Sequence, residues 1–338
     1  MYFFLASLMN ISNPENNGVL TNAVWALSNF CRGKPQPALQ SVAPAIPHLA
    51  NILQLNNKEA LMDACWAISY LSDGDNDRID AVMSGDGIVT NIVNLLDHES
   101  AGIVTPVVRV LGNFVSGNDK QTQTVLEAGV LNHMSNLLTF KKRGVRKEAC
   151  WLLSNIAAGT RDQISQLVRN PKIMQLVVET VRDAEWDVRK EATWVVSNIA
   201  TGGKEEHIHF LVELGAIEAL CSVLDVADAR ITMVVLEAIE NILKVGKQSS
   251  RDYIGFVDEC DGLDKIESLQ EHENNEIYQK VVSIIESYFG VDEIEDENVA
   301  PAIEGDTFTF GMKTDETPAL TGESAFPQQP LQPFNFSS

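Results

Sequence analysis

Residues 146–159, RKEACWLLSNIAAG, carry two kinds of side chain that separate when the segment is drawn as an α-helix. A helix turns by about 100° per residue, so Trp151, Asn155 and Glu148 fall within about 60° of one another. The apolar residues fall on the other side, between about 100° and 200° from Trp151: Leu152, Ile156, Ala149 and Leu153. The apolar stripe is expected to face a core, which leaves the Trp, Asn and Glu side chains on an open face.

Five other segments of the chain have the same apolar stripe. The residues that stand where Trp151 stands are Trp25, Trp66, Arg109, Trp194 and Glu237. In chain order the spacings are 41, 43, 42, 43 and 43 residues, within the range of about 40–47 residues that is typical of armadillo and HEAT repeats. A glycine follows each copy, where it predicts a helix C-cap with a left-handed backbone: Gly33, Gly74, Gly117, Gly159, Gly202 and Gly246.

A second recurring phrase lies between these helices, as in GDGIVTNIVNLLD at residues 85–97, and a shorter helical stretch precedes it. Its apolar residues recur with helical spacing, so each unit is predicted to hold three helices. Units of this kind stack around one continuous core. We therefore expect an all-α fold, a right-handed superhelical solenoid of armadillo repeats, over residues 15–290. Residues 1–14 receive no assignment, and residues 291–338 are predicted to form an acidic, disordered tail that is also rich in Pro, Gln and Ser.

The composition argues against several classes of function. The chain has 338 residues and a net charge of −22, from 47 acidic and 25 basic side chains. This charge disfavours nucleic acid and anionic membranes as partners and favours a basic one. No apolar run is long enough to span a membrane. The five cysteines form no C-x-x-C pair, which is typical of a reduced, intracellular protein, and Cys65 and Cys150 are predicted to be small core residues.

The sequence contains no motif of a catalytic or nucleotide-binding site, so we expect neither an enzyme nor a cofactor. His207 and His209 form an H-x-H pair, but they point about 200° apart on a helix and lack a third ligand, so no metal site is predicted. The basic run KKRGVRK at residues 141–147 is short and is predicted to lie in a loop, where a role in binding nucleic acid is not favoured.

The open face has the chemistry of a groove for an extended basic peptide. An Asn amide offers a donor and an acceptor, as a neighbouring β-strand would. Tryptophans one repeat apart leave slots that suit the stem and cation of Lys or Arg, at about 0.5–2 kcal/mol per contact. Asp63, Glu148 and Glu191 stand one turn before their Trp and can meet the charged tip. Other interpretations stay open: the Trp could pack between helices, the Asn could be solvent-facing or local caps, and Glu148 and Glu191 could pair with Lys147 and Lys190.

Three phrases resemble importin α, the adaptor family that binds nuclear localisation signals: WALSNFCRGKPQP (25–37), ACWAISYLSDGDNDRI (64–79) and VVRVLGNFVSGNDKQTQ (107–123). The resemblance covers residues 15–290 and implies a major peptide site in the early repeats and a minor site in the later ones. It places these residues at the minor site: Trp151, Asn155, Trp194, Asn198, Glu148, Glu191, Asn113, Ser116, Asp119 and Arg109. It places Trp25, Asn29, Asp63 and Trp66 at the far end of the major site, while Tyr70 stands where a further Asn is expected.

The resemblance also implies partners and a location. Basic signal peptides of cargo proteins would bind the groove, an export receptor would bind near residues 260–297, and the protein would shuttle between cytoplasm and nucleus. The family's earlier Trp/Asn units and its basic importin β-binding segment have no counterpart in this sequence. The chain is then either a truncated piece or an adaptor without that segment. As written, it is expected to have a complete minor site, a weak major site and no affinity for importin β. The alternatives are a catenin-like armadillo scaffold, whose groove would carry Lys and Arg, and a fragment without function.

Overall fold

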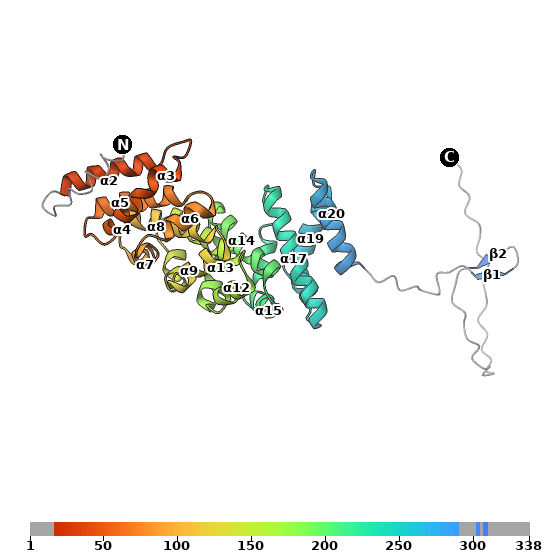
Figure 1. Cartoon of the computed structure of the whole chain (residues 1–338). Coiled ribbons are helices and arrows are strands. Elements are labelled where there is room, and N and C mark those ends of the chain that lie inside the picture. Colours follow the sequence, from red (N-terminus) through yellow and green to blue (C-terminus); the bar gives the residue numbers. More distant parts are fainter. Residues whose placement is uncertain (1–16, 291–301, 305–306, 310–338) are drawn as a thin grey trace, which may run out of the picture. The chain divides into compact units, whose positions relative to one another are not determined.

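The computed structural model describes residues 17–290, 302–304 and 307–309 (Figure 1). The chain divides into two compact units, Met1–Phe289 and Gly290–Ser338. The described helices all belong to the first unit and run from Asn17 to Phe289. Residues 1–14, which received no assignment from the sequence, lie outside the described residues, as does most of the predicted tail.

In the first unit the helices follow the predicted order of short, middle and long. The long helices are α2 (Asn17–Cys31), α5 (Lys58–Ser72), α8 (Ala101–Val115), α11 (Arg143–Ala157), α14 (Trp186–Gly202), α17 (Ala229–Ser249) and α20 (Asn275–Ile284). The middle helices are α4 (Ile46–Ile52), α7 (Ile88–Asn94), α10 (Leu131–Leu138), α13 (Pro171–Asp183), α16 (Ala216–Cys221) and α19 (Gly262–Ser268). The short helices are α3 (Leu39–Val42), α6 (Asn76–Met83), α9 (Asp119–Glu127), α12 (Arg161–Val168), α15 (Glu205–Glu213) and α18 (Tyr253–Glu259). Single turns add η1 (Ala43–Ala45), η2 (Leu95–Asp97), η3 (Leu269–Glu271) and the π turn η4 (Ile285–Phe289).

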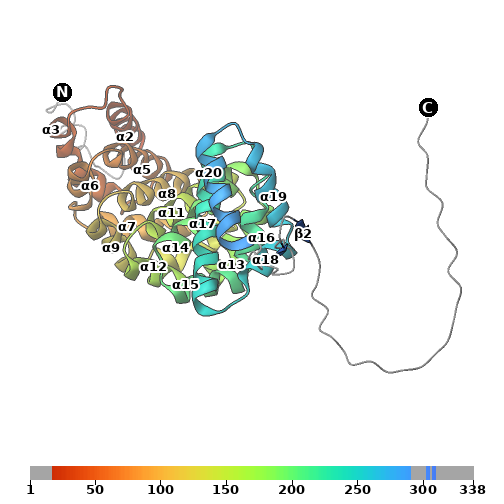
Figure 2. The same ribbon diagram turned by 90° about the vertical axis from the view of Figure 1, so that its right-hand side faces the viewer.

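Each long helix packs against the long helix of the next repeat, from α2 on α5 to α17 on α20. Figure 2 shows α5, α8, α11, α14 and α17 in this succession. One hydrophobic cluster extends from Val24 to Ile284, and the predicted apolar stripe of α11 is fully buried in it, as are Cys65 and Cys150. The prediction of an all-α repeat solenoid is confirmed. None of the helices in the described part of the chain is both long and apolar enough to cross a membrane.

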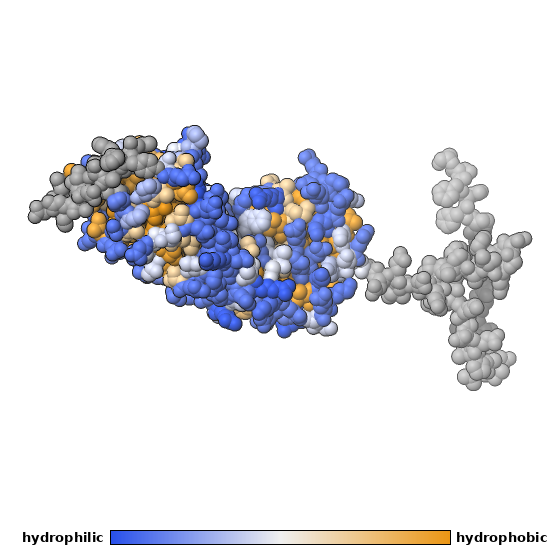
Figure 3. Space-filling view, in the orientation of Figure 1, coloured by the Kyte–Doolittle hydropathy of each residue, from blue (hydrophilic) through white to orange (hydrophobic). Residues whose placement is uncertain are grey.

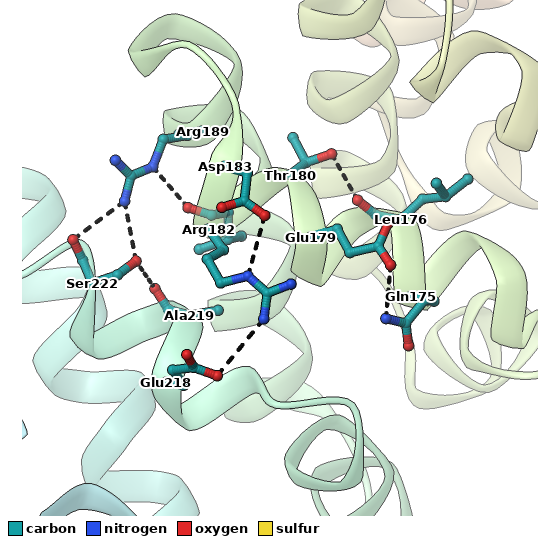
Figure 4. A network of polar contacts seen from close by, with 11 residues as sticks. Gln175, Leu176, Glu179, Thr180, Arg182, Asp183, Arg189, Glu218, Ala219 and Ser222 are labelled. Atoms are coloured by element: carbon teal, nitrogen blue, oxygen red, sulfur yellow. Dashed lines mark hydrogen bonds and ion pairs between the residues drawn. The ribbon is translucent and has the colours of Figure 1, made fainter. Parts of the chain in front are cut away.

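The middle helices form a second stack that polar contacts join. Arg189 on α14 donates through Nε to the carbonyl oxygen of Val181 at 2.7 Å and through Nη2 to Ser222 Oγ at 3.1 Å. Arg182 on α13 lies 3.7 Å from a carboxylate oxygen of Glu218 on α16. Figure 4 shows how these side chains tie α13 and α14 to α16. At this repeat boundary the middle helices are therefore joined by polar contacts in addition to the packing of the long helices.

The glycines after the long helices do not have the role that the sequence predicts. Among the described glycines, the left-handed backbone occurs near the start of middle helices, at Gly87, Gly129 and Gly215 with φ of 67°, 87° and 86°. Gly117 and Gly159 serve a close approach instead, because a Cβ on either would overlap the side-chain amide of Gln121 or Gln163. Each of these glutamines closes a capping box at the start of the next short helix. Gly202 and Gly246 lie within α14 and α17.

The second unit contains two short antiparallel strands, β1 (Ala302–Glu304) and β2 (Thr307–Thr309). Ile303 lies opposite Phe308 in this pair. Branched and aromatic residues of this kind favour strands. These six residues depart from the prediction of an all-α chain with a disordered tail, while residues 291–301 and 310–338 lie outside the described residues.

Candidate peptide-binding groove

The tryptophans of the repeats are neither in the core nor fully free. Trp66 on α5, Trp151 on α11 and Trp194 on α14 are each half-buried. Trp25 on α2 is 59% exposed, and Figure 3 shows apolar surface over the first helices of the array. The interpretation in which these residues pack entirely between helices does not hold, because none of the four is buried, although Trp194 packs in part against the core.

Trp151 is covered on one side by an arginine of the preceding repeat. The guanidinium carbon of Arg109 on α8 lies 5.5 Å from the ring centre of Trp151, a cation–π arrangement. The same guanidinium forms an ion pair with Glu148, whose side chain is 11% exposed against 48% for Arg109. The charge of Glu148 is therefore met across the repeat boundary, not by Lys147 as one interpretation of the sequence proposed.

The ring of Trp151 rests on Gly112, a residue that the sequence analysis did not single out. A Cβ built on Gly112 would have three ring atoms of Trp151 within 3.1 Å, whereas carbon atoms in contact are normally about 3.5–4.0 Å apart. The equivalent position is serine in four other long helices: Ser28, Ser69, Ser154 and Ser197. A glycine at this one position, immediately before Asn113, is the signal from which a close approach of the next helix could have been predicted.

The asparagines bind the preceding repeat through their amide nitrogens. Asn198 Nδ2 donates to the carbonyl oxygen of Ser154 at 2.9 Å, and Asn155 Nδ2 donates to that of Gly112 at 3.4 Å. These bonds join α14 to α11 and α11 to α8, and they set the register of the long helices. Both asparagines are half-buried, and each amide oxygen remains an acceptor for a ligand.

The side chain of Asn113 does not lie where the sequence analysis expects it, at the border of the peptide site. It is only 6% exposed, because its amide donates to the Ser69 carbonyl at 3.0 Å and to Ser72 Oγ at 3.1 Å. Asn113 thus fixes α8 on α5 rather than lining the open face. Ser116 and Asp119 are exposed at the end of α8 and the start of α9.

Glu191 stands out among the acidic residues of the groove. It is half-buried one turn before Trp194, and within the described residues its side chain forms no ion pair or hydrogen bond. Burial raises the pKa of Glu191 and the charge of Glu148 raises it further, while the charges of Lys147, Lys190 and Arg109 lower it. Lys190, the other expected partner, lies 2.7 Å from Asp228 instead. Glu191 is therefore a half-buried carboxylate one turn before an accessible tryptophan, near three cations but, within the described residues, in ion-pair contact with none of them.

The early part of the groove has a different arrangement. Trp66 stacks on Tyr70 with ring centres 5.9 Å apart, so Tyr70 fills the place of an asparagine amide with a second ring. Asn29 donates to the carbonyl of Trp25 in its own helix at 2.9 Å. Burial raises the pKa of Asp63, and Glu59 adds to this effect. The structure thus brings Asp63, Trp66 and Tyr70 together on α5, while Trp25 and Asn29 stand on the exposed face of α2.

The two histidines have structural partners. His207 Nδ1 accepts the backbone N–H of Lys204 at 3.1 Å, and its Nε2 lies 3.2 Å from Ser165 Oγ. His209 Nδ1 lies 2.6 Å from the Tyr253 hydroxyl. In the described part of the chain, no group of three or more His, Cys, Asp or Glu is placed to hold a metal ion.

Comparison with known proteins gives the class of this fold. The Armadillo/beta-catenin-like repeat family matches residues 118–158 and 204–244, and the Atypical Arm repeat matches residues 251–302. A designed armadillo repeat protein in complex with the peptide (KR)4 is 30% identical with a TM-score of 0.64, covering 72% of this chain and 99% of the designed one. A computationally designed armadillo repeat protein for modular peptide recognition is 28% identical with a TM-score of 0.65 and the same coverage. The chain is an armadillo-repeat solenoid.

Among natural proteins, importin α subunits are similar to nearly the whole chain. Importin subunit alpha-1a of Oryza sativa subsp. japonica is 45% identical over 319 residues, which are 91% of this chain and 60% of the relative. Importin subunit alpha-4 of Arabidopsis thaliana is 46% identical over 85% of this chain and 55% of the relative. Importin subunit alpha-B of Dictyostelium discoideum is 44% identical over 92% of this chain and 60% of the relative.

The chain is therefore similar to importin α subunits over 85–92% of its own length, as its sequence phrases predict, and it spans 55–60% of the length of these relatives. None of these names is that of an enzyme, in agreement with the prediction from the sequence.

Proposed function

We propose that this chain acts as a nuclear import adaptor that binds basic nuclear localisation signals as extended peptides along its long helices. The observation that carries the proposal is the pair Trp151 and Trp194, both accessible, with the half-buried carboxylate of Glu191 one turn before Trp194. This carboxylate forms no direct ion pair within the described residues, so a ligand cation can contact it. Guanidinium groups of the chain itself already lie over both rings, so the rings have a geometry that a ligand's Lys or Arg can use. The relatives named as importin subunits and the designed relative solved with (KR)4 support the same class of ligand.

The proposed mechanism uses three kinds of contact in each repeat. The stem of a ligand Lys or Arg lies between Trp151 and Trp194, and its cation meets Glu191. The amide oxygens of Asn155 and Asn198 accept backbone N–H groups of the peptide. Each such hydrogen bond contributes about 1 kcal/mol net. Affinity therefore requires several contacts in register, and a ligand that also reaches Trp66 gains through effective concentration.

The experiment is the binding of a fluorescent Lys/Arg-rich signal peptide, measured by anisotropy. We expect micromolar or tighter binding by the unmodified chain and at least a tenfold loss in the double variant Trp151→Ala/Trp194→Ala. Phe256→Ala is the matched control, because Phe256 is an aromatic residue that is 47% exposed on the short helix α18. An acidic peptide serves as the control ligand. Binding of the acidic peptide in preference to the basic one would support a catenin-like scaffold and refute the proposal.

The proposal extends to transport itself. An adaptor of this kind shuttles between cytoplasm and nucleus, and its last repeats, α18 to α20, are where we propose that an export receptor binds. A fluorescent fusion of the chain is expected to accumulate in the nucleus when export is blocked. A fusion that stays at the same nuclear concentration with and without the block would contradict shuttling.

A further inference from the structure

Arg230 reaches from one repeat onto the tryptophan of the repeat before it. It is the second residue of α17, and its guanidinium carbon lies 5.2 Å from the ring centre of Trp194 on α14. The arrangement mirrors Arg109 over Trp151, but from the opposite direction along the array, since Arg109 comes from the preceding repeat. The two tryptophans of the later groove are therefore bounded on their outer sides by two arginines.

The two arginines are held with different strength. Arg109 is tied to the buried Glu148 as well as to its ring. Arg230 is exposed and, within the described residues, forms no ion pair. The nearest acidic residue in the sequence, Asp228, is engaged by Lys190 at 2.7 Å and caps α17 by accepting the backbone N–H of Ile231. The ring of Trp194 is thus the contact that holds Arg230, and a cation at a helix N-terminus gains nothing from the helix dipole.

The position of Arg230 matters because Trp194 is the last tryptophan in the series of equivalent positions on the long helices. The next long helix carries Glu237 where a tryptophan would stand, so no second ring completes a slot beyond Trp194. A ligand Lys or Arg at that place would have to displace the guanidinium of Arg230 and would lie next to its charge. A ligand Asp or Glu at the same place would meet an unpaired guanidinium, with which it can form a charge-assisted hydrogen bond.

We propose that Arg230 is a specificity-determining residue that ends the cation-binding part of the groove at Trp194. It selects peptides in which the basic cluster is followed, on the side that points toward α17, by an acidic residue and not by a further basic one. This inference rests on the proposed function, because it concerns the same ligand and the same groove.

The experiment compares peptides that share one basic core and differ in one flanking residue, Glu, Ser or Lys, placed at either end so that both orientations of the peptide are covered. Dissociation constants are measured by anisotropy for the unmodified chain, Arg230→Ala, Arg230→Glu and the control Arg161→Ala. Arg161 is an exposed arginine on α12 that forms no ion pair within the described residues, so its replacement changes the net charge equally.

When the flanking residue is at one particular end of the peptide, we expect the peptide with Glu there to bind about three- to tenfold more tightly than the peptide with Lys. Arg230→Ala should abolish this preference, Arg230→Glu should reverse it, and Arg161→Ala should leave it unchanged. A preference that survives in Arg230→Ala, or the absence of any preference in the unmodified chain, overturns the inference.

Trp194→Ala separates the two proposals. If the basic core does not bind the unmodified chain, or binds Trp194→Ala equally well, the proposed function fails and this inference fails with it. If binding of the basic core depends on Trp194 but the preference for the flanking residue is the same in the unmodified chain and in Arg230→Ala, only the inference about Arg230 is refuted.

Discussion

Replacing Gly112 by alanine tests the close contact between α8 and the ring of Trp151. The new Cβ would have three ring atoms within 3.1 Å, so the ring has to move and the stack with Arg109 is disturbed. Overpacking of this kind costs about 1–3 kcal/mol, while alanine in place of glycine within a helix contributes about 1 kcal/mol in favour. We expect the free energy of unfolding to fall by about 1 kcal/mol and the affinity for a basic peptide to fall with it.

The effect of Gly112→Ala on stability should have the opposite sign once the ring of Trp151 is removed. In a Trp151→Ala background the added Cβ meets no ring, so Gly112→Ala should stabilise the chain by up to about 1 kcal/mol through helix propensity alone. The coupling between the two sites, about 2 kcal/mol, falls in the range for residues in direct contact. Urea denaturation followed by circular dichroism of the four proteins in this cycle measures it as shifts of the midpoint. Equal destabilisation by Gly112→Ala in both backgrounds would refute the reasoning.

Three further predictions concern single side chains. Asn198→Ala removes the bond to the Ser154 carbonyl and should lower the free energy of unfolding by about 1 kcal/mol. Asn29→Ala, on an exposed amide that bonds only within its own helix, should change it by less than about 0.5 kcal/mol, and equal losses in denaturant would contradict the cross-repeat role. Burial raises the pKa of Glu191 above its ordinary 4.5, so the folded state binds more protons than the unfolded one and stability falls as the pH rises through that window. Glu191→Gln should therefore raise the urea midpoint at pH 7, while the two midpoints should converge below the ordinary pKa; a lower midpoint at pH 7 would count against this account. Burial lowers the pKa of His207 below its ordinary 6.5, so the folded state binds fewer protons than the unfolded one. The resulting contribution to stability is complete above pH 6.5 and is lost as the pH falls through the lower pKa of the folded state. His207→Gln should flatten this pH dependence in thermal melts, and an unchanged slope would show that another group is responsible.

Much of the architecture could be predicted because it depends on local periodicity. The burial of the apolar stripe in α11 follows from helical spacing, and the repeat length of about 42 residues follows from aligning Trp25 with its equivalents. The capping function of Gly117 and Gly159 was predicted wrongly for a physical reason. A glycine after a helix is compatible both with a left-handed backbone and with the close approach of a neighbouring side chain, and only the position of Gln121 or Gln163 distinguishes the two.

The sequence by itself determined the armadillo-repeat class of fold, the similarity to importin α and the face on which Trp, Asn and Glu gather, since each depends on residues within one helix turn or on a regular spacing. The tertiary structure alone decided which of these groups have partners. It buries Asn113 against α5, pairs Glu148 with Arg109 and sets Arg230 over Trp194, and in the described part of the chain it leaves Glu191 without a direct ion pair. These contacts join residues about 36–44 positions apart. They depend on how one repeat is rotated and shifted against the next, which is a property of the packed stack and not of any single helix.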